Sequence, residues 1–372
     1  MLSRMQPPRA GVGDPLDTIE TPALIIDLDA LERNLDLMRG EVARFPGVRL
    51  RPHAKTHKSP HVARMQVSRG GAVGMCCQTV GEAEMLVREA GVSDVLLSNQ
   101  IVSAGKIARL VELARQGDVA VCVDDPENVT AIAAAAARGG VCLRVLVEVE
   151  VGCNRCGVAP GVPAAILAAR VVEKPSLRFA GIHAYHGAAQ HLYSLTARET
   201  ALRQAVDHVA ATVDAIRATG LTCDLVTGAG TGSWPIEAGS GVYNEVQPGS
   251  YVFMDADYAR VEGAPQKFES ALFVLTTVIS RQADRVVCDA GLKAHSIDTG
   301  PPHVFRRPEL AFARASDEHG VIRAEPAALP RCGERLLLIP GHCDPTVNLY
   351  DHYLCVRHGR IQAVWPITAR GV

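Results

Sequence analysis

Residues 94–149 read DVLLSNQIVSAGKIARLVELARQGDVAVCVDDPENVTAIAAAAARGGVCLRVLVEV, and this stretch decides the fold. Short β-branched runs alternate in it with runs rich in Ala, Leu and Arg. The β-branched runs span residues 94–98, 119–123 and 145–149, and the helix-like runs span 104–115 and 126–137. Strands that alternate with helices of this length are typical of βαβ units with parallel strands. We therefore expect three consecutive strands of a parallel sheet.

The same alternation extends in both directions along the chain. Further strands are expected at residues 48–53, 72–77, 179–184, 223–226 and 245–247, and further helices at 81–90 and 163–172. Eight strands of this kind predict a (β/α)8 barrel. Beyond residue 258, strand-like runs at residues 271–280, 285–289, 336–339, 353–357 and 361–365, separated by Gly, Pro and Asp, predict a smaller, mostly antiparallel β domain.

An additional strand is expected ahead of the barrel, at residues 23–28. We predict that it folds back onto the second domain. This divides the chain into an N-terminal segment that joins the β domain (1–30), the barrel (31–258) and the C-terminal β domain (259–372).

Composition excludes several classes of protein. The 372 residues include 38 Lys and Arg against 40 Asp and Glu, for a net charge of −2, which argues against a general nucleic-acid or anionic-membrane binder. No apolar run approaches membrane-spanning length, and residues 1–13 lack the apolar core of a signal peptide. Eleven cysteines scattered through apparent strands fit buried thiols in a reducing cytoplasm better than a disulfide framework. We therefore expect a cytoplasmic protein.

The octet RPHAKTHK, residues 51–58, places Lys55 among other positive or protonatable groups. Neighbouring cations and partial burial both lower the pKa of an amine, and a neutral amine can attack an aldehyde. That aldehyde could belong to a substrate or to pyridoxal phosphate. On the octet alone, a basic loop that binds phosphate is an equal alternative.

Polar residues collect where the expected barrel strands end, and barrel enzymes place their chemistry at those ends. These residues are Lys55, Gln78, Asn99, Asp124, Asp125, Arg155, His183, Tyr185 and His186, followed by the turns GAGTGS (228–233) and QPGS (247–250). Glycine-rich turns after the last two strands expose backbone N–H groups that can bind phosphate. Together with a lysine at the end of the first strand, they favour a phosphate-bearing cofactor.

A second cluster, PGHCDP, lies at residues 340–345. On an extended segment, His342 and Asp344 would point to the same side and could bind one divalent metal, with Cys343 on the other face. Nitrogen and oxygen ligands favour Mn, Mg, Co or Zn over a thiolate site. A polar turn is the alternative. His191 is a further candidate, because it follows Tyr185 closely enough to reach the same pocket.

Several motifs in this order resemble one enzyme family. They are RPHAKTHK (51–58), VGCNRCGV (151–158), HAYHG (183–187), GAGTGS (228–233), QPGSYVFMD (247–255) and GHCDPT (341–346). The chain resembles the D-threonine aldolase and D-serine dehydratase branch of the alanine-racemase-fold pyridoxal phosphate enzymes, from about Asp17 to its C-terminus. The resemblance implies fold type III, in which a barrel carries the cofactor, and a homodimer with active sites near the subunit boundary.

The resemblance also implies roles for individual residues. Lys55 would be the Schiff-base lysine, Arg155 would lie near the phenolic oxygen of the cofactor, and Tyr185 near its ring. Gln247 stands where alanine racemases present an arginine to the pyridine nitrogen, which weakens a racemase interpretation. The remaining cofactor-binding residues would be Gln78, Gly230, Thr231, Gly249, Ser250 and Tyr251. Of these, Gly230, Thr231, Gly249 and Ser250 would form the phosphate cradle.

His342 and Asp344 match the metal pair of the D-threonine aldolases, whereas the dehydratases have cysteine at the second position. The implied reaction is a retro-aldol cleavage of a D-β-hydroxy-α-amino acid to glycine and an aldehyde, with Mn as the expected metal and His191 as the base. One alternative is a D-serine or D-3-hydroxyaspartate dehydratase that yields a 2-oxo acid and ammonia. Another alternative is a non-catalytic carrier of pyridoxal phosphate. The presence of the β domain with its metal pair argues against this alternative.

Overall fold

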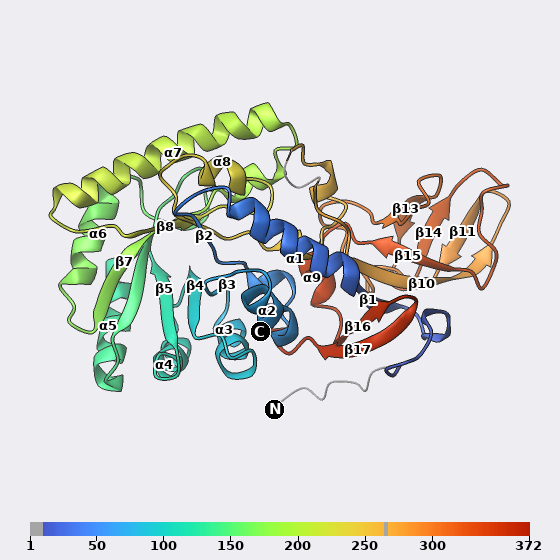
Figure 1. Ribbon diagram of the computed structural model, residues 1–372, viewed down its shortest axis with the longest axis horizontal. Helices are drawn as coiled ribbons and strands as arrows, with labels where there is room; N and C mark the ends of the chain where they lie inside the picture. Colours follow the sequence, from blue (N-terminus) through green and yellow to red (C-terminus); the bar gives the residue numbers. More distant parts are fainter. Residues whose placement is uncertain (1–9, 264–266) are drawn as a thin grey trace.

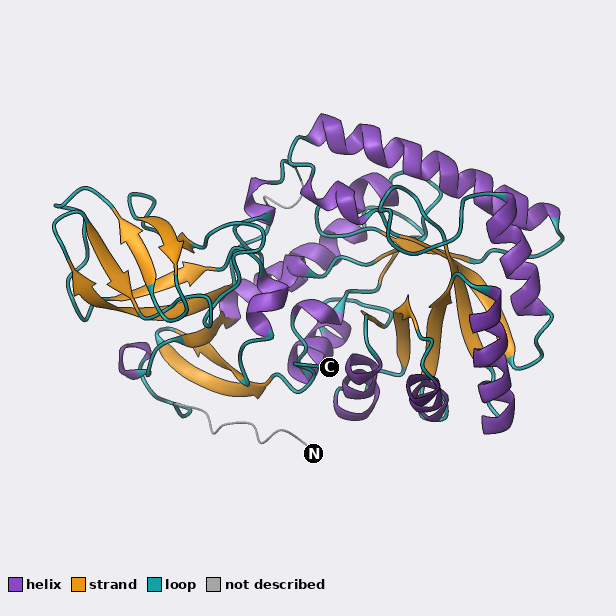
Figure 2. Cartoon of the chain, turned by 180° about the vertical axis from the view of Figure 1, so that it is seen from behind, coloured by secondary structure: helices purple, strands orange, loops and turns teal. Residues whose placement is uncertain are grey.

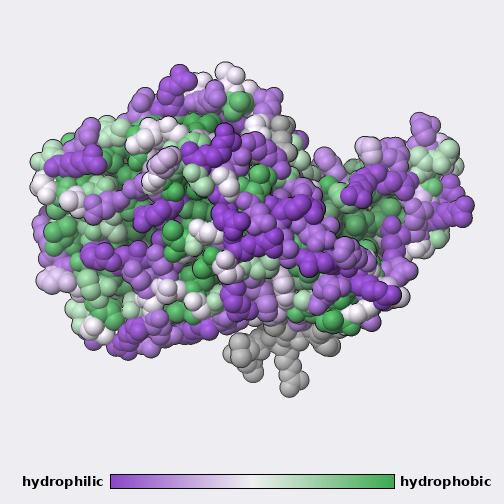
Figure 3. Space-filling view, in the orientation of Figure 1, coloured by the Kyte–Doolittle hydropathy of each residue, from purple (hydrophilic) through white to green (hydrophobic). Residues whose placement is uncertain are grey.

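The structure is a computed structural model that describes residues 10–263 and 267–372, so the expectation for residues 1–9 lies outside the described residues. It has a larger α/β body and a smaller lobe built on a second sheet (Figure 1). The space-filling view shows a notch between the two (Figure 3). No described helix is long and apolar enough to cross a membrane.

The larger body contains an eight-stranded parallel sheet in the order β2-β9-β8-β7-β6-β5-β4-β3. Its strands are β2 (Arg49–Leu50), β3 (Met75–Cys77), β4 (Asp94–Gln100), β5 (Asp118–Val123), β6 (Leu143–Glu148), β7 (Leu177–Ala184), β8 (Leu225–Gly228) and β9 (Glu245–Val246). The two ends of the sheet meet beyond β2, where the N–H of Cys76 donates to the carbonyl of Pro52 at 2.8 Å. The predicted eight-stranded α/β fold is therefore confirmed.

Helices follow most of these strands and cover the outside of the sheet (Figure 2). They are α1 (Leu28–Val42), α2 (Pro60–Ser68), α3 (Val80–Glu84) continued by η3 (Met85–Glu89), α4 (Ala104–Leu113), α5 (Pro126–Gly139), α6 (Val162–Val172), α7 (Leu195–Ala218) and α8 (Trp234–Ala238). Local sequence sets their ends. In α5 the Asp125 carboxylate accepts the N–H of Asn128 at 2.8 Å, Pro126 opens the first turn, and Gly140 ends the helix in the left-handed conformation.

The strands divide their side chains between two cores. Leu96, Ala120 and Leu146 pack together in one buried cluster, whereas their neighbours Val95 and Val121 belong to the larger cluster that includes the helices. Successive residues of a strand point to opposite faces, so this division is the expected one. Strands β4, β5 and β6 are therefore largely buried on both sides, which explains their almost continuous hydrophobic runs.

The smaller lobe is a mostly antiparallel sheet. Its strands are β1 (Ala23–Asp27), β10 (Leu272–Arg281), β11 (Arg285–Cys288), β12 (His303–Val304), β13 (Ala311–Ala315), β14 (Gly320–Arg323), β15 (Arg335–Ile339), β16 (His352–Arg357) and β17 (Arg360–Pro366). The N-terminal strand β1 pairs antiparallel to β10 and parallel to β16. Strands β12 to β14 were not predicted, because they are short and mix charged with apolar residues.

Candidate active site

A cavity of about 250 Å³ lies at the C-terminal ends of the parallel strands. Most of the residues predicted to bind a cofactor line it: Lys55, Gln78, Arg155, Tyr185, Gly230, Thr231, Gln247, Gly249 and Ser250. The prediction missed other lining residues, namely His53, Thr56, Ser98, His183, Ala229 and Tyr258. His183 had been noted only as a strand-end residue. His53 and Thr56 lie in the RPHAKTHK octet and Ala229 in the GAGTGS turn, so these motifs could have indicated them, whereas no motif pointed to Ser98 or Tyr258.

Lys55 lies on the short helix η2 (Ala54–Thr56), just beyond the first barrel strand. Its Nζ donates a hydrogen bond to Oδ2 of Asp344, and 40% of its side chain is exposed. Burial lowers the pKa of Lys55, but the Asp344 carboxylate outweighs burial and raises the pKa above its ordinary value. The expectation that the pKa of Lys55 is lowered is therefore wrong.

The other cations of the octet do not act on Lys55 as expected, because each has its own acidic partner. Arg51 is almost fully buried and forms ion pairs with Glu245 at 2.8 Å and Asp94 at 2.9 Å. Lys58 pairs with Glu82 at 2.5 Å. The positive charges of Arg51 and Lys58 are thus neutralised by their own partners, and Asp344 is the charged group with the largest effect on the pKa of Lys55.

His53 forms part of the cavity wall as a neutral side chain. Its Nδ1 accepts the backbone N–H of Lys55 at 3.2 Å, and its Nε2 lies 2.9 Å from the side-chain amide of Gln78. Burial lowers its pKa well below the ordinary value. Because Nδ1 accepts, the proton of the neutral ring is on Nε2, and the Gln78 amide must turn its oxygen toward it. Gln78 also bonds to Ser98 at 3.0 Å, so this wall is rigid.

Arg155 sits above the cavity on the loop after β6. The guanidinium carbon is 5.7 Å from the centre of the Tyr185 ring, and Nη2 is 3.9 Å from Oε1 of Glu148. The carboxylate of Glu150 organises the loop by accepting the N–H of Gly152 at 2.5 Å and the N–H of Arg155 at 3.1 Å. A positive charge is thereby held next to an aromatic ring at the cavity wall.

The two glycine-rich turns leave no room for side chains. A Cβ on Gly230 would lie 2.5 Å from Oε1 of Gln190, and a Cβ on Gly249 would lie 2.8 Å from Oγ1 of Thr56. The turns are also joined, since Oγ1 of Thr231 accepts the backbone N–H of Tyr251 at 3.1 Å. Within the first turn, the N–H of Gly230 donates to Oγ of Ser233 at 3.1 Å and the N–H of Gly232 donates to Oε1 of Gln190 at 2.9 Å, so the turn is held by its own hydrogen bonds.

Tyr251 was expected among the cofactor-binding residues, but the structure does not bring its side chain to the cavity. The ring is fully buried against Phe268, and the hydroxyl accepts a hydrogen bond from Gln66 at 3.2 Å. Only its backbone reaches the phosphate-type turn. Alternation along the QPGSYV segment could not reveal this, because residues 250–252 form a helical turn rather than a strand.

The floor of the cavity is a network that starts from Gln247. His183 Nε2 lies 3.2 Å from Oε1 of Gln247, and the amide nitrogen of Gln247 donates to Thr227 at 2.7 Å. His183, Glu148 and Cys122 also bring potential metal-ligand atoms within 4.8 Å of one another. The Glu148 carboxylate already accepts a hydrogen bond from Gln100 at 2.5 Å.

The segment that carries His342 and Asp344 is not extended, which corrects the sequence-based geometry. Strand β15 ends at Ile339, His342 is the N-cap of helix α9 (Cys343–Val347), and Asp344 is in its first turn. The buried thiol of Cys343 lies 3.3 Å from the carbonyl oxygen of Met254, and burial raises its pKa well above the ordinary value. Cys343 was expected on the face opposite His342 and Asp344. Its thiol is indeed buried against Met254, but a helical turn rather than an extended segment places it there.

The His342 and Asp344 side chains lie at the start of helix α9 and differ in their hydrogen-bond partners. Nδ1 of His342 is 2.8 Å from Oδ2 of Asp298, a partner that the sequence did not indicate, and Nε2 remains available. Oδ1 of Asp344 is buried without a hydrogen-bond partner among the described residues. A histidine nitrogen oriented by a carboxylate and an unpaired carboxylate oxygen form a donor set that fits a divalent metal.

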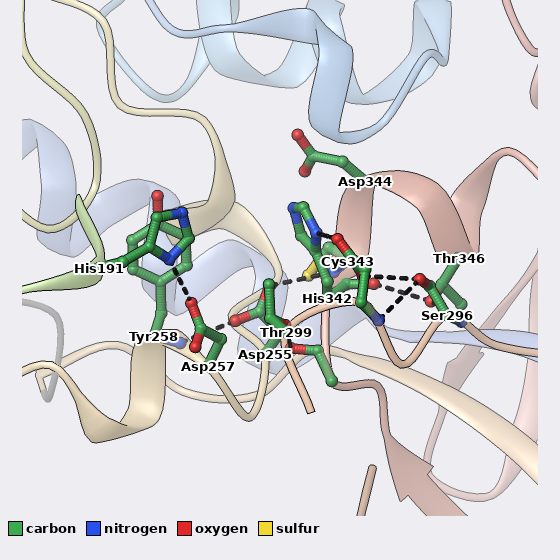
Figure 4. Close-up of polar contacts among 12 residues, drawn as sticks. His191, Asp255, Asp257, Tyr258, Ser296, Thr299, His342, Cys343, Asp344 and Thr346 are labelled. Atoms are coloured by element: carbon green, nitrogen blue, oxygen red, sulfur yellow. Dashed lines mark hydrogen bonds and ion pairs between the residues drawn. The ribbon is translucent and has the colours of Figure 1, made fainter. Parts of the chain in front are cut away.

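His191 ends the short helix η4 (Gly187–His191) after β7. Its side chain is 54% exposed, and its Nδ1 lies 3.0 Å from Oδ2 of Asp257, as Figure 4 shows. His191 is not among the residues that line the cavity, in contrast to the expectation. Its partner Asp257 is adjacent to Tyr258, which does line the cavity, so His191 lies at the rim of the site.

Comparison with known proteins gives a consistent family assignment. Residues 26–257 match the family described as "Alanine racemase, N-terminal domain", and residues 271–356 match a serine dehydratase domain. The chain is 46% identical to the 3-hydroxy-D-aspartate aldolase of Paracoccus denitrificans (strain Pd 1222), over 95% of this chain and 92% of that protein. It is 45% identical to the D-threonine aldolase of an Arthrobacter species, over 98% and 96% of the two chains. The crystal structure of D-threonine aldolase from Filomicrobium marinum superposes with a TM-score of 0.95 at 47% identity, and covers 98% of this chain and 99% of that one.

Proposed function

This chain belongs to the alanine racemase-like family and to its D-hydroxyamino acid aldolase branch, and from that membership we propose that it is a pyridoxal phosphate-dependent aldolase. Its substrates are D-β-hydroxy-α-amino acids such as D-threonine or 3-hydroxy-D-aspartate. The products are glycine and an aldehyde. The reaction breaks the bond between Cα and Cβ, which makes the protein a carbon–carbon lyase.

One observation carries the proposal: the Asp344 carboxylate contacts the amine of Lys55 at the mouth of the cavity. The two residues are 289 positions apart, and the contact joins the expected cofactor lysine to the expected metal pair. A substrate attached near Lys55 would therefore have its β-hydroxyl within reach of an ion on His342 and Asp344. The second residue of the expected metal pair is an acid, Asp344, where the dehydratases have cysteine. This difference supports an aldolase over a dehydratase.

The cavity fits pyridoxal phosphate by its shape and donor groups. Gly230, Thr231, Gly249 and Ser250 would hold the phosphate through turns that lack space for a Cβ at either glycine. Arg155 would hold the phenolic oxygen. When bound, the cofactor supplies an electron sink for the pair left at Cα after bond cleavage.

Gln247 favours an aldolase over a racemase in this arrangement. Its side-chain oxygen is near Nε2 of His183, which leaves an amide rather than a guanidinium to face the cofactor ring nitrogen. An amide carries no formal charge, so it does not repel a proton on that nitrogen.

A divalent metal on His342 and Asp344 would supply a Lewis acid for the substrate hydroxyl, and Mn²⁺ is the ion we expect. Asp298 orients His342 by accepting from its Nδ1–H, so that Nε2 can act as the ligand. His191 is the base that takes the hydroxyl proton. As an exposed histidine at the rim, it can pass this proton to solvent.

The proposal is tested by product analysis with D-threonine and 3-hydroxy-D-aspartate in the presence of pyridoxal phosphate and Mn²⁺. The expected products are glycine and an aldehyde, with no turnover of L-threonine and none by Lys55→Ala. A 2-oxo acid and ammonia would show a dehydratase. Failure to bind pyridoxal phosphate at Lys55, measured by borohydride reduction and peptide mapping, would contradict the shared premise.

A pair of variants at position 344 tests the metal role. Asp344→Cys introduces the dehydratase residue, and Asp344→Asn keeps the size of the side chain without its charge. Both should lose Mn²⁺-dependent glycine formation. If Asp344→Asn stays fully active after chelation, then Asp344 does not hold a metal.

The proposal includes two further properties expected from the sequence, a homodimer and a cytoplasmic location. Light scattering should give twice the mass of one chain. A mass equal to one chain would contradict the dimer without affecting the chemistry.

A further inference from the structure

The exposed His191 is bound to an aspartate that is almost completely buried. The exposed fraction is 54% for the His191 side chain and 3% for the Asp257 side chain, and Nδ1 lies 3.0 Å from Oδ2. A surface histidine usually moves freely in solvent. Here a fixed carboxylate from a segment 66 residues away limits that freedom.

The Asp257 carboxylate is itself held in place by two other donors. The Tyr193 hydroxyl donates to Oδ1 at 2.7 Å, and Nη2 of Arg260 donates to the same oxygen at 2.5 Å. The Arg260 guanidinium also stacks on the Tyr193 ring, with 4.3 Å between its carbon and the ring centre. Oδ1 is therefore fully engaged, and Oδ2 is directed to His191.

The carboxylate is charged under ordinary conditions. Burial raises the pKa of Asp257, but the hydrogen bonds from Tyr193 and Arg260 outweigh burial, so the net pKa lies below its ordinary value. A charged carboxylate accepts hydrogen bonds and donates none. Nδ1 of a neutral His191 must consequently carry the proton, and Nε2 keeps its lone pair.

The backbone around Asp257 is bonded to the turn that carries His342. The N–H of Ala256 donates to the carbonyl of Pro340 at 2.9 Å, and the N–H of Asp257 donates to that of Gly341 at 3.2 Å. Asp255 adds a third link, since its carboxylate accepts the N–H of Cys343 at 3.0 Å (Figure 4). The segment that orients His191 is thus the one that supports the metal-pair helix.

We propose that Asp257 is a positioning residue, which holds His191 in the tautomer with Nδ1 protonated and Nε2 free to accept a proton. This deepens the proposed aldolase function and rests on it for the role of His191 as a base. Through the same backbone segment, Asp257 sets where that base stands relative to His342. Asp257 itself touches neither substrate nor cofactor.

Histidine side-chain ¹H–¹⁵N NMR tests the tautomer directly, on holoenzyme loaded with diamagnetic Mg²⁺. The His191 signals are assigned by their absence in His191→Gln. We expect a protonated Nδ1 and an unprotonated Nε2 in the wild type. In Asp257→Asn, the side-chain amide can donate to Nδ1 and should reverse the pattern. The matched control is Asp298→Asn, which removes the other His–Asp pair and should alter the His342 signals while those of His191 stay unchanged.

Kinetics of the same variants test the consequence. For Asp257→Asn we expect kcat to fall about 10²- to 10⁴-fold, the size of effect known for general bases held in the wrong tautomer, with a much smaller change in KM. Asp257→Glu keeps the carboxylate and should recover part of the loss. Unchanged cofactor absorbance and near-UV circular dichroism distinguish this loss from unfolding.

The possible outcomes separate the two proposals. A wild-type His191 with the proton on Nε2 overturns the positioning role, whatever the enzyme does. The expected tautomer together with full kcat in Asp257→Asn also overturns it and leaves the aldolase proposal intact. Absence of aldolase activity in the wild type overturns the proposed function, and the tautomer measurement remains valid.

Discussion

Glu237 provides a quantitative test of how burial controls ionisation next to the phosphate-type turn. It lies in helix α8, directly after the GAGTGS turn, and only 1% of the residue is exposed. Burial raises the pKa of this carboxyl to about 8, against an ordinary value of 4.5, although the Ser233 hydroxyl acts in the opposite direction. The folded protein therefore keeps Glu237 protonated at neutral pH.

A raised pKa makes the folded state bind the proton more tightly than the unfolded chain does. The resulting stabilisation is fully present below pH 4.5 and is lost as the pH rises to about 8. At about 1.4 kcal/mol for each pKa unit, the loss is about 5 kcal/mol, as an order of magnitude. Glu237→Gln is neutral at every pH, so this particular loss should be absent from its free energy of unfolding.

The assay is urea unfolding between pH 5 and pH 9, followed by the fluorescence of the two tryptophans, Trp234 and Trp365. The stability of Glu237→Gln relative to the wild type should increase from pH 5 to about pH 8 and then level off. The exposed Glu127→Gln is the control and should differ from the wild type by a constant amount. If the Glu237→Gln difference is also constant with pH, then the carboxyl ionises normally and the reasoning from burial is wrong.

Three other substitutions test separate parts of the structure. Asp298→Asn should weaken metal binding about 10- to 100-fold in calorimetric titration, because the ligand histidine loses its orienting carboxylate, and an unchanged affinity would remove that role. Gly249→Ala should reduce the affinity of the apoenzyme for pyridoxal phosphate in an absorbance titration, since its Cβ would lie 2.8 Å from Oγ1 of Thr56, whereas equal affinity would show that the turn can relax. Arg51→Met should lower the free energy of unfolding by about 3–5 kcal/mol, because it removes the 2.8 Å partner of the buried Glu245 and leaves that carboxylate with only the longer ion pair to Arg49 at 3.6 Å, and a loss below 1 kcal/mol in denaturant unfolding would contradict this.

Periodicity and strand ends were enough to predict the barrel and most of its cavity. Strands buried on both faces give hydrophobic runs that are easy to recognise, and parallel strands bring their carboxyl ends to one edge. Lys55, Gln247 and the glycine turns could therefore be placed together from the sequence. The short strands β12 to β14 were missed, since strands of two to five residues with mixed polarity have no such signal.

The ionisation state of Lys55 shows the limit of local reasoning. Its sequence neighbours predicted a lowered pKa, but Arg51 and Lys58 are neutralised by acids from other segments, and Asp344 raises the pKa instead. Electrostatic interactions depend on distance in space, so a charge 289 residues away decided the outcome.

The sequence by itself determined the α/β barrel, the grouping of Lys55 with the glycine-rich turns and the types of ligand available, because these follow from local patterns of hydrophobicity and from side-chain chemistry. Only the tertiary structure decided which carboxylate contacts which nitrogen-bearing side chain. Asp344 contacts Lys55, Asp298 contacts His342, and Asp257 contacts His191. Each of these pairs joins loops that are distant along the chain. Hydrogen bonds of this kind form only after packing has fixed the loops, and no local pattern in the sequence records them.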